Sequence, residues 1–191
     1  MNSKNKGNTF ERKISESLSL WLTKGEEKRA CWRSDTSGAA ATIWAKKGQE
    51  ARYVQANAGD IRQIADKGLY EELDNFFNTF VIECKSYAKV DFYPPFNKTL
   101  TDWFDQLLKE KETTGKKALL IVKSNNRKIL YCQEPTEGQH HQASKLFSIY
   151  YKSMTLDVYL FDDVVPTTHE PRTSRNRTPQ SQAEPTEDLP V

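Results

Sequence analysis

This sequence of 191 residues has no long hydrophobic run, no paired cysteines and little net charge. Its apolar stretches, such as Ala118–Val122, are far too short to span a bilayer, so we expect no membrane segment. The first residues are polar and no apolar core follows them, so we expect no signal peptide either. These absences predict a soluble protein of the cytoplasm.

The cysteines are few and widely separated. The chain has three, Cys31, Cys84 and Cys132, and no two of them have the CxxC spacing typical of zinc sites. An odd number without an evident pairing predicts reduced thiols and no zinc site. The formal net charge is only +2, so overall charge gives no argument for nucleic-acid binding, and local charge has to supply one.

The composition divides the chain into one globular domain and a tail. Hydrophobic residues make up 37% and charged residues 28%, which leaves enough apolar material for one core. We place the domain at residues 1–165. Residues 166–191 hold five prolines among Thr, Ser and Gln and have little to bury, so we expect a disordered tail. Its arginines, Arg172, Arg175 and Arg177, either make a weak DNA contact or are simply solvated.

Apolar periodicity predicts an α/β fold with a mixed β-sheet flanked by helices. The first predicted elements are a helix from Asn8 or Thr9 to about Gly25, a strand at Gly59–Ile61, a partly helical stretch over Asp66–Asn78 and a strand over Thr79–Lys85. A second helix is predicted from Thr99 or Thr101 to Glu112, closed by Gly115. After it we expect strands over Lys117–Ser124 and Lys128–Cys132 around a turn at Asn125 and Asn126, a short helix over Ser144–Tyr151 and a strand over Leu156–Phe161.

The strand over Thr79–Lys85 carries the first candidate site residues. Side chains alternate along a strand, so Glu83 and Lys85 share one face while the alternate apolar residues take the other. Burying two charges costs several kcal/mol unless they are paired or used. This cost indicates a function, although the Glu-x-Lys spacing alone is common and recurs at Glu26 in a charge run.

A second carboxylate is expected beside Glu83. Asp60 begins a predicted strand that we expect to pair with the Glu83 strand. Two carboxylates and a backbone carbonyl, for which we take that of Cys84, form the hard oxygen site that Mg²⁺ or Mn²⁺ prefers. The metal would stabilise charge at a phosphate and activate a water, with Lys85 as a compact cation beside them. Asp74 is the rival of Asp60, because it lies closer to Glu83 in sequence, but its surroundings predict a helix.

Glu11 on the first predicted helix has two interpretations. In one, it approaches the same metal from the side. In the other, Asn8 is the N-cap and Glu11, three residues later, completes a capping box. The two roles do not exclude each other, and the sequence leaves both open.

These segments, in this order, resemble a known nuclease family. Lys6–Arg12, Ser37-Gly38, Gly59–Ile61 and Ile82–Ser86 are similar to the archaeal-type Holliday junction resolvases and to small PD-(D/E)xK endonucleases of bacteriophage genomes. The similarity covers about residues 6–124, and a glycine stands at 59 where the motif name has proline. It implies a restriction-endonuclease-like fold, and the cytoplasm of a bacterial host if a phage encodes the protein.

The resemblance also implies roles for single residues. In this family a helix Glu, an Asp and the motif Glu gather the divalent metal, and the motif Lys assists catalysis. The corresponding residues here are Glu11, Asp60, Glu83 and Lys85. A serine on a mobile segment touches the DNA junction, for which Ser37 is the candidate. Gln106 is the candidate for a polar residue on the helix after the Lys strand, and we expect it to contact the DNA.

Some basic residues are placed to follow a DNA backbone. Arg12 and Lys13 lie beside Glu11, after Lys4 and Lys6, and Lys123 lies near the end of a buried-type strand. Such residues contact phosphates and give a salt-dependent affinity.

Three functions are compatible with the sequence. The leading one is a divalent-metal-dependent DNA endonuclease, with branched DNA as a candidate substrate and a homodimer to place two symmetric cuts. A restriction-type or single-strand nuclease of phage replication or packaging would use the same site. The third is a DNA-binding or packaging adaptor with a nuclease-like fold and no activity, which is disfavoured because Asp60, Glu83 and Lys85 are all present.

Overall fold

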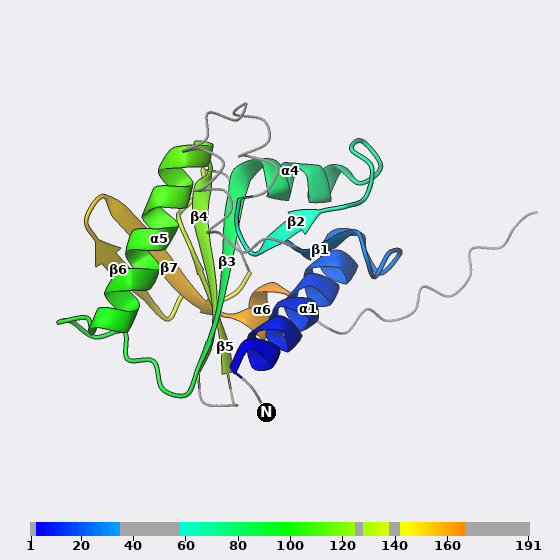
Figure 1. The fold of residues 1–191 in the computed structure, drawn as a ribbon. Helices are drawn as coiled ribbons and strands as arrows, with labels where there is room; N and C mark the ends of the chain where they lie inside the picture. The colour runs from blue at the N-terminus through cyan, green and yellow to red at the C-terminus, as the bar shows by residue number, and fades with distance from the viewer. Residues whose placement is uncertain (1–2, 35–57, 125–127, 138–141, 167–191) are drawn as a thin grey trace, which may run out of the picture.

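The structure, a computed structural model, describes residues 3–34, 58–124, 128–137 and 142–166 (Figure 1). The helices are α1 (Ser3–Leu22), α4 (Glu71–Thr79), α5 (Lys98–Thr114) and α6 (Phe161–Val164). The strands are β1 (Cys31–Arg33), β2 (Ile61–Gln63), β3 (Phe80–Tyr87), β4 (Lys117–Ser124), β5 (Lys128–Gln133), β6 (Phe147–Tyr151) and β7 (Met154–Leu160). None of the helices in these ranges is long and apolar enough to cross a membrane.

The main sheet has five strands in the order β3-β4-β5-β7-β6. The pair β3 and β4 is parallel, because α5 carries the chain back between them, and the other three pairs are antiparallel. β1 and β2 form a separate antiparallel pair. The predicted mixed sheet flanked by helices is therefore confirmed, and β3 lies at one edge of it.

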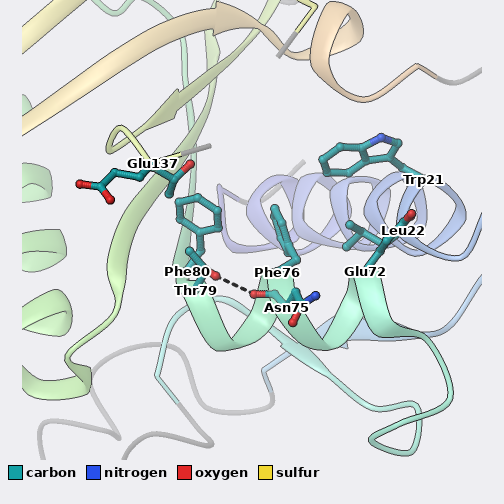
Figure 2. A pocket seen from close by; sticks show the side chains of 9 residues that line it. Trp21, Leu22, Glu72, Asn75, Phe76, Thr79, Phe80 and Glu137 are labelled. Atoms are coloured by element: carbon teal, nitrogen blue, oxygen red, sulfur yellow. Dashed lines mark hydrogen bonds between the residues drawn. The ribbon is translucent and has the colours of Figure 1, made fainter. Parts of the chain in front are cut away.

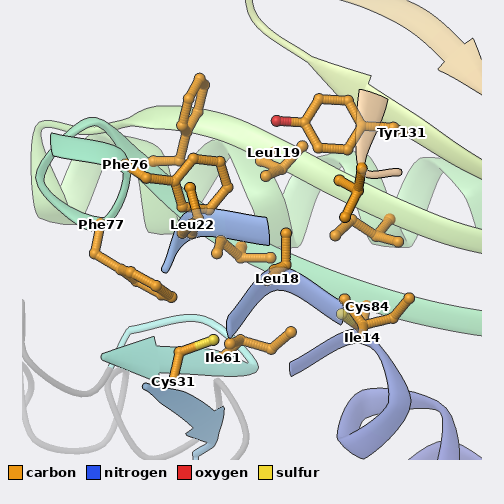
Figure 3. Close-up of a cluster of buried hydrophobic side chains, with 14 of the residues drawn as sticks. Ile14, Leu18, Leu22, Cys31, Ile61, Phe76, Phe77, Cys84, Leu119 and Tyr131 are labelled. Atoms are coloured by element: carbon orange, nitrogen blue, oxygen red, sulfur yellow. The ribbon is translucent and has the colours of Figure 1, made fainter. Parts of the chain in front are cut away.

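Two apolar clusters cover the two faces of the sheet. On one face, α1, α4 and α6 pack against alternate residues of the strands (Figure 3), including Phe80, Ile82 and Cys84 of β3. On the other face, α5 packs against Ala118, Leu120 and Val122 of β4. The alternation leaves Glu83 on the α5 face of β3, as the sequence predicted.

The caps of α5 follow from its end residues. The Asn97 side chain accepts a hydrogen bond from the backbone N–H of Leu100, and Gly115 adopts the left-handed conformation with φ 69°. The predicted end at Gly115 is confirmed, and the start at Lys98 lies one residue before the earliest predicted start.

The predicted start of the first helix was wrong. α1 begins at Ser3, because no proline interrupts it and Gly7 is tolerated inside a helix at a modest cost. Asn8 is therefore an interior residue and forms no capping box with Glu11. Its side chain instead accepts a hydrogen bond from Arg33 Nη2 at 3.1 Å.

Two further predictions were wrong. The expected short helix over Ser144–Tyr151 contains β6, whose aromatic and β-branched side chains favour a strand and which pairs with β7 at the edge of the sheet. The strand after Asp60 does not pair with β3, because β2 pairs with β1, which comes from a distant part of the chain. The predicted turn at Asn125 and Asn126 and residues 167–191 of the predicted tail lie outside the described residues.

Candidate active site

Asp60 docks onto the free edge of β3. Its backbone N–H donates to the Ile82 carbonyl at 2.7 Å, and its side-chain Oδ2 accepts from the Cys84 N–H at 2.8 Å. These two bonds continue the hydrogen-bonding pattern of the sheet by a single residue. They hold Asp60 beside Glu83 even though no strand of the described residues pairs there, and Asp60 is only 6% exposed.

Gly59 makes this docking possible. Its φ of 80° is outside the range of proline, whose ring fixes φ near −65°. A Cβ atom at this position would lie 2.7 Å from the Ile82 carbonyl oxygen. The glycine that replaces proline in the motif is therefore what lets the chain approach β3 closely.

Glu83 and Lys85 are held by a helix residue. Glu83 is fully buried, and its Oε2 accepts from Lys85 Nζ at 2.6 Å and from Gln106 Nε2 at 3.0 Å. Gln106 Oε1 in turn accepts from Lys85 Nζ at 3.1 Å. The fold thus brings Gln106 of α5 to the two strand residues, and Lys85 is fixed by two acceptors.

Glu110 is a buried site neighbour that the sequence analysis missed. It is 5% exposed, and its Oε1 accepts from Gln106 Nε2 at 3.2 Å. Glu110 follows Gln106 by one helical turn, so both project from the same side of α5 toward Glu83. Two polar residues at this spacing beside an apolar stripe are the signal that could have identified it.

Burial raises the pKa values of the two site carboxyl groups. Burial and, to a smaller extent, the charge of Glu110 raise the pKa of Glu83 to about 8, against the opposing charge of Lys85. Burial and the charge of Glu83 raise the pKa of Asp60 well above its usual range. Burial alone would lower the pKa of Lys85, but the neighbouring Glu83 and Asp60 raise it, which keeps the ammonium charged.

The donor set fits a hard divalent cation. Glu83 Oε1 is buried and has no hydrogen-bond partner. Asp60 accepts a hydrogen bond through Oδ2, and its Oδ1 accepts none within the described part of the chain. Among the described residues, no three His, Cys, Asp or Glu side chains are grouped so that they could hold a metal ion by themselves. Two oxygens of this kind, completed by a carbonyl and waters, suit Mg²⁺.

Glu11 lies at the border of the site and is paired. Its Oε2 accepts from Arg33 Nε at 3.0 Å, and both side chains are mostly buried. The charge of Glu11 adds to the raised pKa values of Asp60 and Cys84, so it lies within electrostatic reach of both groups. Arg33 was not predicted, because only the β1–β2 pair brings it to α1.

The other predicted residues lie at different places. Asp74 is held away from the site, where its Oδ1 accepts from Gln63 Nε2 at 2.6 Å and its Oδ2 from the Gly68 N–H at 2.6 Å. Arg12 and Lys13 are exposed on α1. Lys123 pairs in register with Ser86, so it is on the face opposite Lys85. Ser37 lies outside the described residues.

A separate hollow lies between α1 and α4. It has a volume of about 430 Å³ and is lined by Trp21, Phe76 and Phe80 among others (Figure 2). None of the predicted site residues lines it.

Comparison with known proteins assigns the chain to a family. The family model described as "Phage putative PDDEXK endonuclease" matches residues 2–171, which is most of the chain. The chain belongs to this family. The resemblance seen in the sequence is therefore confirmed for a PD-(D/E)xK nuclease family of phage type, and the family name supports nuclease activity. No curated protein and no solved structure matches it.

Asp60, Glu83 and Lys85 meet at the edge strand β3. The family name contains these three residue types. The β3–α5–β4 unit carries the Glu and the Lys on one strand and Gln106 on the crossover helix.

Proposed function

We propose that the chain is a divalent-metal-dependent DNA endonuclease that hydrolyses phosphodiester bonds, with Mg²⁺ or Mn²⁺ as its metal. Asp60, Glu83 and the Cys84 backbone carbonyl would hold the ion, and Glu11 would approach it from the side. One observation carries the proposal. Two buried carboxylates are held side by side at the edge of β3, each with an oxygen that lacks a partner among the described residues.

The chain's own residues would orient the reaction. When bound, the metal stabilises charge on the scissile phosphate and lowers the pKa of a water. Lys85 supplies a second positive charge at a fixed point, because Glu83 and Gln106 both hold its ammonium group. Glu83 would thus use one oxygen for the metal and the other for Lys85, which sets the distance between the two positive charges.

Branched DNA is the substrate that we propose first. Resolution of a four-way junction needs two symmetric cuts, which a two-fold homodimer supplies. Arg12 and Lys13, which are exposed on the same helix as Glu11, are proposed to contact phosphates, together with Ser37 and Lys123.

Cleavage of three labelled substrates tests the proposal. Four-way junction, linear duplex and single-stranded DNA are each incubated with Mg²⁺ or Mn²⁺, or with EDTA. We expect symmetric nicking of the junction, lost in EDTA and lowered at least about 100-fold by Lys85→Ala. The exposed Lys98→Ala is the matched control and should cut like the wild type.

The other outcomes separate the alternatives. Cutting of every substrate would overturn the junction preference but keep the metal site, and would indicate a restriction-type or single-strand nuclease. A folded wild-type protein that binds DNA and cuts nothing with either metal would contradict the catalytic proposal and leave a DNA-binding or packaging adaptor.

A further inference from the structure

A second cavity of the molecule is lined by cations. It has a volume of about 160 Å³ and lies between β2, the end of α4 and the start of β4. Arg62, Lys67 and Lys116 line it, and the other lining residues are Ala58, Ile61, Gln63, Phe77, Asn78 and Phe80. No carboxylate is among them. We call it the basic cavity.

The charges of Lys67 and Lys116 have little compensation among the described residues. Within these ranges, neither lysine forms an ion pair, and the Lys116 ammonium donates only to the neutral Phe77 carbonyl, at 2.6 Å. Burial and the charge of Lys67 lower the pKa of Lys116, so the two ammonium groups lie close enough to repel each other. Asp74 interacts with Lys67 but is committed to Gln63 and Gly68.

The chain connects the basic cavity directly to the candidate active site. Ile61 and Arg62 follow Asp60 without a gap, and Phe80 precedes Glu83 on the same strand. Three residues of strand span about 10 Å. Successive phosphates of one DNA strand advance by about 3.4 Å along the helix axis and also wind around it, so this span corresponds to about one or two nucleotides.

We propose that the basic cavity binds one backbone phosphate of the DNA, about one or two nucleotides from the bond that is cut. The two close ammonium groups of Lys67 and Lys116 attract a phosphate, whose charge relieves their mutual repulsion. The proposal rests on the proposed function, since it names a contact of the same substrate. Occupation of the cavity would fix the register of the DNA strand against Asp60 and Glu83, without reading a base.

Equilibrium DNA binding as a function of salt tests the proposal. Anisotropy of a labelled oligonucleotide is followed in Ca²⁺, which replaces the catalytic metal, for the wild type and for the double variant Lys67→Met/Lys116→Met. Removing one phosphate contact should lower the affinity about 10-fold and reduce the slope of log K against log salt by about 1. The control is Lys145→Met/Lys152→Met, which removes the same charge next to β6, at the opposite edge of the sheet.

A neutral analogue in place of one DNA phosphate locates the contact. A single methylphosphonate is moved along the oligonucleotide, and at one position it should weaken wild-type binding about 10-fold while the double variant is indifferent to it. The single variant Lys67→Met repeats the comparison without touching the core, because Lys67 is exposed. Cleavage at saturating DNA is measured in parallel.

The results distinguish this proposal from the proposed function. Double and control variants that bind DNA equally would overturn the phosphate contact, even if the wild type cuts. A second result would also overturn the DNA contact. In it, inorganic phosphate stabilises the fold only when both lysines are present, but the double variant binds DNA as the wild type does, so the cavity binds free phosphate. A wild type that cuts nothing, but whose affinity and salt slope fall in the double variant and not in the control, would support the contact and contradict the nuclease reaction.

Discussion

At the scale of single residues, Gln106 forms more side-chain hydrogen bonds at the candidate site than Glu83, Lys85 or Glu110 does. Its amide oxygen faces Lys85, and its amide nitrogen faces Glu83 and Glu110. Because Glu110 accepts from the nitrogen, the amide cannot turn over without losing three bonds. Gln106 and Glu110 therefore position Lys85 and Glu83, and the expected contact of Gln106 with the DNA stays a prediction.

The first prediction concerns this amide. Gln106→Ala should lower kcat about 100-fold, because Lys85 loses one of two acceptors and a small displacement at a reacting centre is that costly. KM should change little. Glu110→Gln keeps an oxygen that can accept from Gln106 and should retain most activity, whereas Glu110→Ala should not. Equal effects of the two Glu110 variants on single-turnover cleavage would contradict a positioning role.

The second prediction separates the two aspartates. Asp60→Asn should abolish metal-dependent cleavage, and Asp74→Asn should leave it unchanged, because Asp74 is bonded to Gln63 and Gly68 instead. If cleavage assays gave the reverse result, Asp74 would be the metal ligand.

Asp74 also has a predicted effect on stability that depends on pH. Hydrogen bonds from Gln63 and Gly68 lower the pKa of Asp74 below its ordinary value, so the ionised form favours the folded state. Its contribution is complete above the unfolded pKa of about 3.9 and is lost as the pH falls through the folded value. Urea unfolding should therefore show the wild type more stable than Asp74→Asn at pH 6, with the difference disappearing toward pH 3. A difference that grows on acidification would contradict this assignment.

At the scale of elements, the approach of the β2 segment to β3 decides the site. Asp60 reaches the edge of β3 only because Gly59 has no Cβ atom and adopts a positive φ. The Ser34 side chain donates to the Gly59 carbonyl at 2.9 Å and the Ser34 N–H to the Asp60 carbonyl at 2.8 Å, which holds the segment from its other side.

Gly59 and Gly68 make a matched pair for a test. Both have positive φ, 80° and 87°, but a Cβ atom at Gly68 would have nothing within 4 Å. Gly68→Ala should therefore lose only the conformational term of about 1–2 kcal/mol. Gly59→Ala should lose more, roughly 3 kcal/mol, because the backbone must also move away from Ile82. It should lose cleavage as well.

Denaturant unfolding and cleavage rates of both variants check this difference. Equal losses of stability would mean that the close approach of the chain at Gly59 has no energetic role.

At the scale of the whole molecule, a bound metal should stabilise the fold. The ion would join Asp60, on the β2 segment, to Glu83 on the main sheet. At a metal concentration of 100 times Kd, the gain is about 2.7 kcal/mol, which corresponds to a rise in Tm of about 5–10 °C for a chain of this size. Thermal melts with Mg²⁺ or Mn²⁺ against EDTA should show this rise for the wild type and no rise for Asp60→Asn. The same rise in Asp60→Asn would place the ion elsewhere.

The sequence by itself determined those features of this protein that depend on residues close together in the chain. Alternation along one strand separates Glu83 and Lys85 from the apolar residues beside them, because the period of a strand depends only on the backbone. Asn97 and Gly115 delimit α5 by bonds and angles within a few residues. The mixed α/β class followed from the order of such elements, and the family resemblance from short motifs. The residue roles at the site stay predictions.

Only the tertiary structure decided which distant residues meet. Asp60 contacts β3 through one residue rather than a paired strand, and Arg33 neutralises Glu11 across two elements. The four aromatic and aliphatic residues of β6 suit a helix or a strand, and pairing with β7 makes them a strand. These outcomes depend on contacts between residues far apart in the chain, whose free energy is gained only when the sheet forms, and no local pattern encodes them.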